Sequence, residues 1–260
     1  MCQLNIAIST ISNRIESLNL IQYDGIQYVI VHQEPHQASA GIVKSLIDRP
    51  DVIYVPLEKK GLSVSRNTAL VNATGDYVLI MDDDVTFSIS SIEQLLEQAE
   101  REHVDVATYY HRYSDGTTTL RKGNSFIHNK FNISSPSSID ICIKRSAIIG
   151  CNIKFDENFG LGAIYPSGEE MIFLSDCLKN NLLVKRYPIE ICTHPPVASG
   201  LDFYTSLDKT VAKYAMLKRI FPVAGQYIFI LFVIKKMPQA FKANKLIHFI
   251  KNSFISFMKN

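Results

Sequence analysis

Several features that define specialised protein classes are scarce in this 260-residue sequence. It has only 12 glycines and 10 prolines, and it contains neither an internal repeat nor a low-complexity linker. Apolar residues make up 47% of the chain and charged residues 20%, which excludes fibrous and disordered proteins. A globular chain of this length can bury the core of one α/β domain, or of two small domains at most.

Cysteine is also sparse, and its pattern argues against disulfide-stabilised and zinc-binding proteins. The five cysteines are odd in number and scattered, and no Cys-x-x-Cys pair occurs. We therefore expect reduced thiols in a cytoplasmic protein. The first residues, MCQLNIAIST, lack a basic segment followed by an apolar one, so no secretory signal is predicted.

Acidic residues are missing from one end of the chain. Residues 209–260 contain ten lysines and arginines but neither aspartate nor glutamate. The other 208 residues hold 17 basic and 25 acidic side chains, a net charge of −8 that the overall +2 conceals. This asymmetry indicates that the C-terminal segment faces different surroundings from the rest.

Short β-branched runs alternate with helical patterns along the first hundred residues, which is typical of an α/β fold with a parallel sheet. Strands are predicted at Leu4–Thr10, Gln27–His32, Val52–Val55 and Tyr77–Met81. Helices are predicted at Ala38–Asp48 and Ser63–Val71, with a third opened by a capping box at Ser90–Glu93 and ending near His103.

The later elements are less regular. Predicted in chain order are a strand at Val104–Tyr109, a turn at Asp115–Gly116, a loop at Asn124–Ser138, a strand at Ser138–Lys144, a helix at Glu169–Asn180, a strand at Leu182–Tyr187 and an active-site loop at His194–Gly200. We expect one catalytic domain, residues 1–202, followed by a C-terminal helical segment, residues 203–260.

Three carboxylates, Asp82, Asp83 and Asp84, directly follow the apolar strand at Tyr77–Met81. The carboxyl ends of such strands form the edge where open α/β sheets bind ligands. Adjacent carboxylates repel one another without a cation, and oxygen ligands suit Mg²⁺ or Mn²⁺. A metal site is therefore predicted, with a solvated acidic turn as the alternative.

A glycine-led helix start precedes this motif. Gly61 is followed by capping hydroxyls and, one turn into the helix, by Arg66. A helix N-terminus and a guanidinium together favour a diphosphate or an ordered carboxylate. The alternative is an ordinary capped helix with Arg66 in a structural ion pair.

The run GLSVSRNTALVNATGDYVLIMDDDV resembles the central signature of the family 2, GT-A-fold glycosyltransferases. The downstream segments Phe155–Gly160 and Gly168–Glu170 are similar to the second signature of that family. The resemblance covers roughly residues 3–200. It implies a GT-A-like, Rossmann-type and mostly parallel sheet flanked by helices, a nucleotide-diphospho-sugar donor, a divalent metal and transfer with inversion.

The resemblance also implies roles for individual residues. Asp82 would lie near the ribose and the metal, Asp84 would be a direct metal ligand, and Asp83 would line the donor site. The remaining donor-binding positions implied are Ser9, Thr10, Arg66, and either Gln33 or Glu34.

The second acidic site is Glu169-Glu170, where the family usually shows Glu-Asp with the second carboxylate as general base. Helix neighbours point about 100° apart, so only one of the two can face the acceptor. Position favours Glu170, with Glu169 as the rival and two surface carboxylates at a helix start as the alternative. Several relatives use a histidine beyond this motif as another metal ligand. His194 falls in that region, although a loop histidine can also be structural.

The C-terminal segment interleaves aromatic residues and lysines after an apolar stretch, Phe221–Ile234, that is short for a membrane span. We expect residues from about 221 onward to lie on an anionic membrane and to be largely dispensable for donor chemistry. The alternative is a helix packed on the catalytic domain with a solvated basic face. Nucleic acid is not an expected partner, because the acidic part of the chain would repel phosphates.

The sequence thus predicts an inverting glycosyltransferase that uses Mn²⁺ or Mg²⁺ and a nucleotide-diphospho-sugar, with a UDP-sugar expected. The acceptor would be a glycan or a lipid-linked oligosaccharide in bacterial-type surface polysaccharide synthesis, at the inner face of the cell membrane. The rival hypotheses are a nucleotidyltransferase or other metal-dependent nucleotide enzyme, and a non-catalytic glycan-binding relative.

Overall fold

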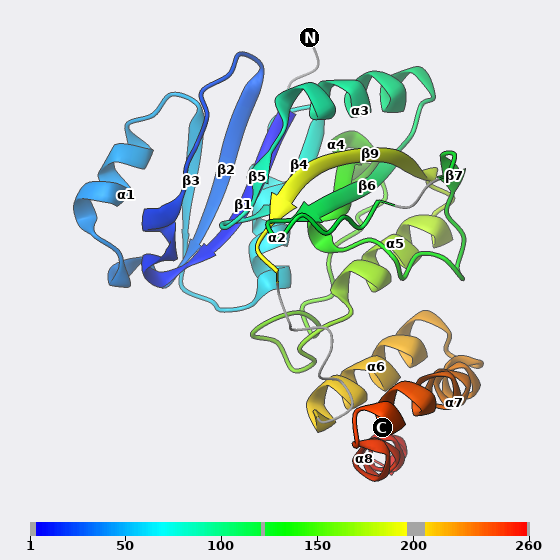
Figure 1. Ribbon diagram of the computed structural model, residues 1–260. Helices are drawn as coiled ribbons and strands as arrows, with labels where there is room; N and C mark the ends of the chain where they lie inside the picture. Colours follow the sequence, from blue (N-terminus) through cyan, green and yellow to red (C-terminus); the bar gives the residue numbers. More distant parts are fainter. Residues whose placement is uncertain (1–3, 121–122, 197–205, 259–260) are drawn as a thin grey trace.

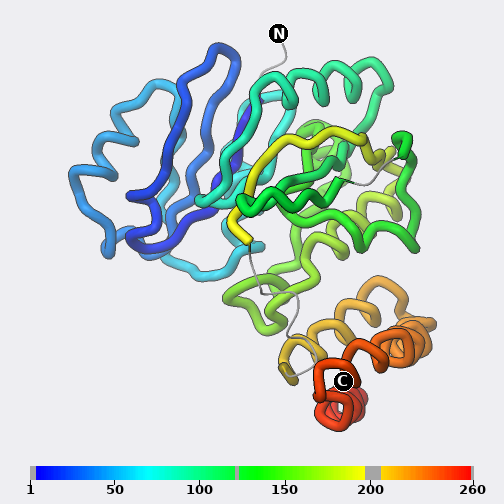
Figure 2. The backbone as a smooth tube through the Cα atoms, viewed as in Figure 1, coloured from blue at the N-terminus to red at the C-terminus, as the bar shows by residue number. Residues whose placement is uncertain are grey.

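The computed structural model of the protein describes residues 4–120, 123–196 and 206–258. A curved nine-stranded sheet carries helices on both faces, and three further helices gather at one end of the molecule (Figures 1 and 2). The mixed α/β class predicted from the sequence is confirmed. The expected domain boundary at residues 202/203 and most of the His194–Gly200 loop lie outside the described residues.

The elements of the first half of the chain are β1 (Leu4–Ile11), η1 (Ser12–Ser17), β2 (Ile26–Gln33), η2 (Pro35–Gln37), α1 (Ala40–Ile47), β3 (Val52–Leu57), α2 (Leu62–Asn72), β4 (Tyr77–Asp82), β5 (Thr86–Phe87) and α3 (Ile89–Arg101). Those of the second half are β6 (Val106–Tyr113), β7 (Phe126–Ile127), η3 (Ser138–Asp140), β8 (Ile141–Lys144), α4 (Arg145–Gly150), α5 (Glu169–Lys179), β9 (Val184–His194), α6 (Leu207–Ile220), α7 (Gly225–Lys242) and α8 (Leu246–Met258).

The strand order is β3-β2-β1-β4-β8-β6-β9-β5, with β7 also paired to β9. The first four strands are parallel, as predicted. By contrast, β8 runs antiparallel to both β4 and β6. It follows a long loop and η3 rather than a crossover helix, so the chain can return in the opposite direction.

Because β6 is antiparallel to β8, it runs in the same direction as β4. Strand β9 is parallel to β6. The carboxyl ends of β1, β2, β4, β6 and β9 therefore meet at one edge of the sheet. The register aligns Ser9 of β1 with Asp82 of β4 and Tyr113 of β6 with His194 of β9. Residues far apart in the sequence thus reach the same edge.

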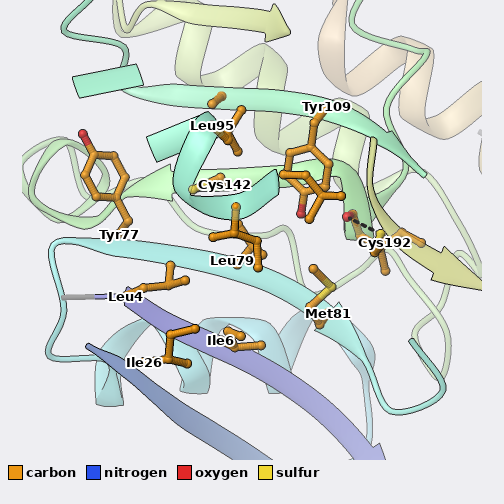
Figure 3. Close-up of a cluster of buried hydrophobic side chains, with 14 of the residues drawn as sticks. Leu4, Ile6, Ile26, Tyr77, Leu79, Met81, Leu95, Tyr109, Cys142 and Cys192 are labelled. Carbon is orange, nitrogen blue, oxygen red and sulfur yellow. Dashed lines mark hydrogen bonds between the residues drawn. The ribbon is translucent and has the colours of Figure 1, made fainter. Parts of the chain in front are cut away.

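The sheet is apolar on both faces because alternate residues of its inner strands point to opposite sides. In β4, Leu79 and Met81 belong to one core, whereas Val78 and Ile80 belong to the other. Figure 3 shows the first core, in which Leu79 lies among side chains of the neighbouring strands and Leu95 of α3. The second core is covered by α2, α4 and α5.

The predicted start of α3 is wrong by two residues. Ser88 is the N-cap, and its hydroxyl accepts a hydrogen bond from the Ser91 backbone N–H, so the expected capping box at Ser90 does not form. Ile92, Leu95 and Ala99 form the buried stripe. The helix therefore begins at Ile89, because the Ser88 hydroxyl caps it two residues before the expected Ser90.

A third hydrophobic cluster joins the C-terminal helices to α5 and to the segment that precedes α5. Tyr214 of α6 packs on Phe229 of α7 and Phe257 of α8. Ile172 of α5 and Phe159 belong to the same cluster. Residues beyond 221 thus share a core with α5 and α6, so their removal would expose buried apolar surface. Within the described ranges, no helix combines the length and apolar character needed to cross a bilayer.

Candidate active site

The three aspartates at the end of β4 lie in three different environments. Asp82 Oδ1 lies 3.6 Å from Arg66 Nη2. Burial raises the pKa of Asp82 above its ordinary value, and the Arg66 charge opposes this rise. Asp83 is buried and accepts a hydrogen bond from the Thr10 hydroxyl at 2.7 Å. The third carboxylate, Asp84, is the most exposed of the three.

Arg14, which no sequence motif indicated, binds two of these carboxylates. Its Nε donates to both carboxylate oxygens of Asp83, at 3.0 and 2.9 Å, and its Nη2 lies 3.2 Å from Asp84 Oδ2. Through these contacts, the guanidinium holds the turn after β4 against η1, the short helix that follows β1. In the sequence, Arg14 is simply a cation three residues beyond β1. Its contact with the aspartates can be expected only when β1 and β4 are known to be neighbouring strands.

His194 ends β9 and faces Asp84, with Nε2 of the ring 3.4 Å from Asp84 Oδ1. The other ring nitrogen, Nδ1, lies 2.6 Å from the Pro195 carbonyl oxygen and therefore donates a proton to it. The ring thus turns its Nε2 atom toward the Asp84 carboxylate, and one divalent metal could contact both groups.

Further protein ligands for such a metal are few. Among the described residues, no group of three or more His, Cys, Asp or Glu side chains has a metal-binding arrangement. The predicted ligand set of Asp84, Asp82 and His194 is brought to one edge, but Asp82 lies beside Arg66. Mg²⁺ is commonly held by one or two carboxylates together with substrate phosphates and water.

Arg66 is the buried charge at the centre of the site, with a relative exposure of 1%. Its Nη1 donates to Glu169 Oε1 at 3.1 Å and lies 3.9 Å from Glu170 Oε1. The guanidinium also lies 5.6 Å from the centre of the Phe155 ring. Arg66 therefore links Asp82 at the end of β4 to the two glutamates at the start of α5. It makes these contacts from the protein interior and not from the surface.

The two glutamates at the start of α5 differ in exposure. Glu169 is buried against Arg66, whereas the Glu170 side chain is 24% exposed. Burial and the neighbouring Glu169 charge raise the pKa of Glu170 to about 7. A carboxylate with a pKa near neutrality and partial access to solvent is suited to accept a proton.

Glycine at position 160 permits the close approach of these groups. Gly160 has φ +108, and a Cβ there would lie 3.2 Å from both Glu169 Cδ and Ser63 Oγ. The Ser63 hydroxyl donates to the Phe159 carbonyl oxygen at 2.6 Å. The segment before α5 is thereby fixed against the start of α2.

The other predicted donor-binding residues lie at the ends of β1 and β2, where each has a partner in the protein. Ser9 accepts a hydrogen bond from the Ser65 hydroxyl at 2.8 Å. Gln33 Oε1 accepts one from the Gly61 backbone N–H at 2.7 Å. Glu34 accepts one from the Ser12 hydroxyl at 3.0 Å, and Lys60 Nζ lies 2.6 Å from its Oε1. That Lys60 contact is the main cause of the lowered pKa of Glu34.

Lys213 of α6 is a second residue that the motifs did not indicate. Burial lowers the pKa of its ammonium group, and the charge of the nearby Glu170 opposes this. Its Nζ lies 5.7 Å from the centre of the Phe232 ring. A helix of the C-terminal segment thus supplies a charge beside the start of α5.

Comparison with known proteins identifies the family of this chain. The model of glycosyl transferase family 2 matches residues 5–156, which is more than half of the chain. The chain belongs to this family. The matched stretch includes Arg66 and all three aspartates, whereas Glu169, Glu170 and His194 lie beyond it.

Similar proteins include the glycosyltransferase GlyA of Streptococcus pneumoniae, 30% identical over 99 residues that are 37% of this chain and 14% of the relative. The minor teichoic acid biosynthesis protein GgaB of Bacillus subtilis is 26% identical over 172 residues, covering 58% of this chain and 18% of the relative. The succinoglycan biosynthesis protein ExoM of Rhizobium meliloti is 29% identical over 87 residues, covering 32% of this chain and 28% of the relative. The chain therefore spans less than a third of each relative's length.

The fold is shared with S. aureus TarS. Its residues 1–349 in complex with UDP-GlcNAc align with a TM-score of 0.66 at 13% identity, covering 99% of this chain and 92% of that one. The complex of the same TarS residues with UDP aligns with a TM-score of 0.64 at 16% identity, covering 91% and 72%. This likeness confirms the expected GT-A-like architecture.

Proposed function

We propose that the protein is an inverting glycosyltransferase that moves a sugar from a nucleotide-diphospho-sugar to a glycan or lipid-linked acceptor. The observation that carries this proposal is the meeting of two separate carboxylate sites at one sheet edge. Asp84 lies beside His194, and Arg66 links the neighbouring Asp82 to Glu169 and Glu170 at the start of α5. One site suits a metal-bound diphosphate, and the other suits the removal of a proton.

Asp84 and His194 would hold Mn²⁺ or Mg²⁺, with Asp82 nearby as a ligand to the metal or to the ribose. When bound, the metal would stabilise the negative charge that develops on the leaving diphosphate. Arg66 would keep Asp82 and Glu169 in place, because its guanidinium contacts both. We expect the donor to be a UDP-sugar. The UDP and UDP-GlcNAc complexes of TarS, a protein of the same fold, support this expectation.

Glu170 would act as the general base. Its carboxylate takes the proton from the acceptor hydroxyl as that oxygen attacks the anomeric carbon and the bond to the diphosphate breaks. Glu169 is held by Arg66 and is less suited to this role. Transfer with inversion needs one base and no covalent nucleophile.

We further propose that the acceptor belongs to surface polysaccharide synthesis at the inner face of the cell membrane. The biosynthetic roles in the names of GgaB and ExoM support the pathway class. The basic C-terminal segment supports a reaction close to a membrane.

The proposal is tested by incubating the protein with UDP-, GDP-, CDP- and dTDP-sugars in the presence of Mn²⁺ or EDTA. One donor should release nucleoside diphosphate slowly without acceptor, and EDTA should stop the release. Its diphosphate at 100 times its Kd should stabilise the fold by about 2.7 kcal/mol. Release of pyrophosphate would instead indicate a nucleotidyltransferase, and glycan binding without any turnover would indicate a non-catalytic relative.

A further inference from the structure

Helix α8 buries small polar side chains beside its inward phenylalanines and exposes large apolar ones, unlike a typical helix of a water-soluble bundle. Its buried side carries Asn252, Ser253 and Ser256 beside Phe249. The two buried serine hydroxyls donate to backbone carbonyl oxygens four residues earlier, at 2.8 Å each. The two serine side chains thus form their hydrogen bonds within the helix, and their small size allows close packing against α6 and α7.

The outward side of α8 is apolar. Ile247 is 85% exposed, Phe254 67% and Met258 75%, with Ile250 between them. The spacing of three to four residues places all four on one stripe of the helix. A helix that hides serines and presents isoleucine and phenylalanine is adapted to an apolar environment outside the protein.

Helix α7 repeats this arrangement. Tyr227, Leu231, Ile234 and Phe241 are each more than half exposed and recur at helical spacing. The opposite side of α7 packs inward through Phe229 and Ala240. We call these two apolar stripes the outer face: Tyr227, Leu231, Ile234 and Phe241 of α7, and Ile247, Ile250, Phe254 and Met258 of α8.

Charge identifies what covers the outer face. Exposed lysines occur along α7, at the connection and on α8, namely Lys235, Lys242, Lys245 and Lys251. No acidic residue follows Asp208 in the sequence. A second copy of this face would bring lysines against lysines, whereas an anionic lipid surface offers both an apolar layer and compensating charge.

We propose that the outer face of α7 and α8 docks in the interfacial layer of an anionic lipid bilayer, with its lysines among the headgroups. This deepens the proposed function and rests on it for the reaction that occurs there. The docking also orients the active site. Arg219 of α6 binds Asp176 of α5 at 2.8 Å, and a Cβ at Gly168 would lie 3.0 Å from Met216 of α6. The helix that carries Glu170 is therefore held at a fixed position relative to the outer face.

The absence of tryptophan from the sequence allows a direct test. In the full chain, Phe254→Trp places a single fluorophore on the outer face. Its emission should shift to the blue, and brominated lipid should quench it, when vesicles containing phosphatidylglycerol are added. The matched control is Phe131→Trp, at a residue that is 88% exposed in the catalytic region, and it should show neither change. Identical responses from both proteins, or no response from Phe254→Trp, would overturn the proposal.

Vesicle sedimentation gives an independent measurement. Ile247→Ser with Phe254→Ser should weaken partitioning onto phosphatidylglycerol vesicles by about tenfold or more, because exposed apolar area drives the insertion. Val71→Ser with Phe131→Ser removes similarly exposed apolar groups elsewhere and should leave partitioning unchanged. Lys242→Gln with Lys251→Gln should weaken it, and Lys44→Gln on α1 should not.

Donor hydrolysis without lipid separates this proposal from the proposed function, because none of these substitutions lies in the active site. If hydrolysis is absent while wild-type protein binds vesicles, only the proposed function fails. If hydrolysis persists while wild-type protein ignores anionic vesicles at low salt, only the docking fails. A stable dimer that Phe254→Ser dissociates, together with indifference to vesicles, would assign the outer face to a second copy and overturn the docking.

Discussion

The catalytic region and the C-terminal helices treat charge in opposite ways. In the catalytic region, the buried side chains include Arg66, Asp83 and Glu169, which meet near one sheet edge. In α6–α8, the buried polar side chains within the described residues are Thr210, Asn252, Ser253 and Ser256, none of them charged. Most charges there lie outside with large apolar side chains beside them, and Lys213, whose pKa burial lowers, is an exception.

The burial of side chains therefore serves a different purpose in each region. In the catalytic region, desolvation and close pairing change the pKa of carboxylates such as Asp82 and Glu170, which creates chemistry. In the C-terminal region, the interior holds aromatic rings and small hydroxyl groups that form hydrogen bonds within their own helix. The apolar stripes on the outside remain available for contact with another surface. Substitutions should therefore impair catalysis in the first region and folding or membrane binding in the second.

The largest effect is expected for Asp84→Ala, which should abolish transfer and Mn²⁺-dependent nucleotide binding while the fold survives. Loss of the metal would forfeit several kcal/mol of transition-state stabilisation. Calorimetric titration with nucleoside diphosphate and Mn²⁺ measures the binding, and Asp24→Ala, in an exposed turn, is the control. An active Asp84→Ala protein, or wild-type activity in excess EDTA, would contradict the metal assignment.

Glu170→Gln should lower turnover by roughly 10²–10⁴ with little change in donor binding, because a general base acts on the acceptor. Glu169→Gln should act differently. It removes the closest and most buried carboxylate partner of Arg66, and breaking such a buried pair should cost about 3–5 kcal/mol of stability. Steady-state kinetics and urea denaturation of both variants test this, and the reverse pattern would exchange the roles of the two glutamates.

Phe249→Ala should destabilise the C-terminal helices, because Phe249 is fully buried on the inner side of α8. Removal of a buried phenylalanine side chain typically costs about 3–5 kcal/mol. Thermal unfolding followed by circular dichroism measures the loss. An unchanged melting temperature would mean that α8 does not pack on α6 and α7 in solution.

The pH dependence of the reaction should reveal Glu170. Because its pKa is raised to about 7, the base is protonated below neutrality. The value of kcat/KM should therefore rise with pH, by about tenfold per unit well below pH 7, and level off above it. The residual activity of Glu170→Gln should lack this rise. A wild-type profile that is flat from pH 5 to 8 would argue against Glu170 as the base.

The smallest effect is expected for Phe254→Ala measured without lipid. Phe254 lies five residues from Phe249 but on the outer face, so its removal should change the free energy of unfolding by no more than about 0.5 kcal/mol. Urea denaturation in lipid-free buffer provides the measurement. A loss comparable to that of Phe249→Ala would show that a protein surface covers Phe254 in solution.

Much of the fold followed from local pattern. The apolar runs at β1–β4 and the helical patterns of α1 and α2 predicted these elements to within a few residues. The reversal at β8 was not predictable, because a four-residue apolar strand carries no signal of its direction. The position of His194 depends on that reversal, since it gives β6 and β9 the direction of β4.

The sequence by itself determined the strands and most helix positions of the first hundred residues, the carboxylate motifs at the strand and helix ends, and the charge asymmetry of the chain. These depend on periodicity, adjacency and composition, which are local. Only the tertiary structure divided Asp82, Asp83 and Asp84 among Arg66, Arg14 and His194, and it paired Arg66 with Glu169, 103 residues away. It also decided which side of α8 faces inward. Such choices depend on which surfaces meet when the chain packs, and no local pattern contains that information.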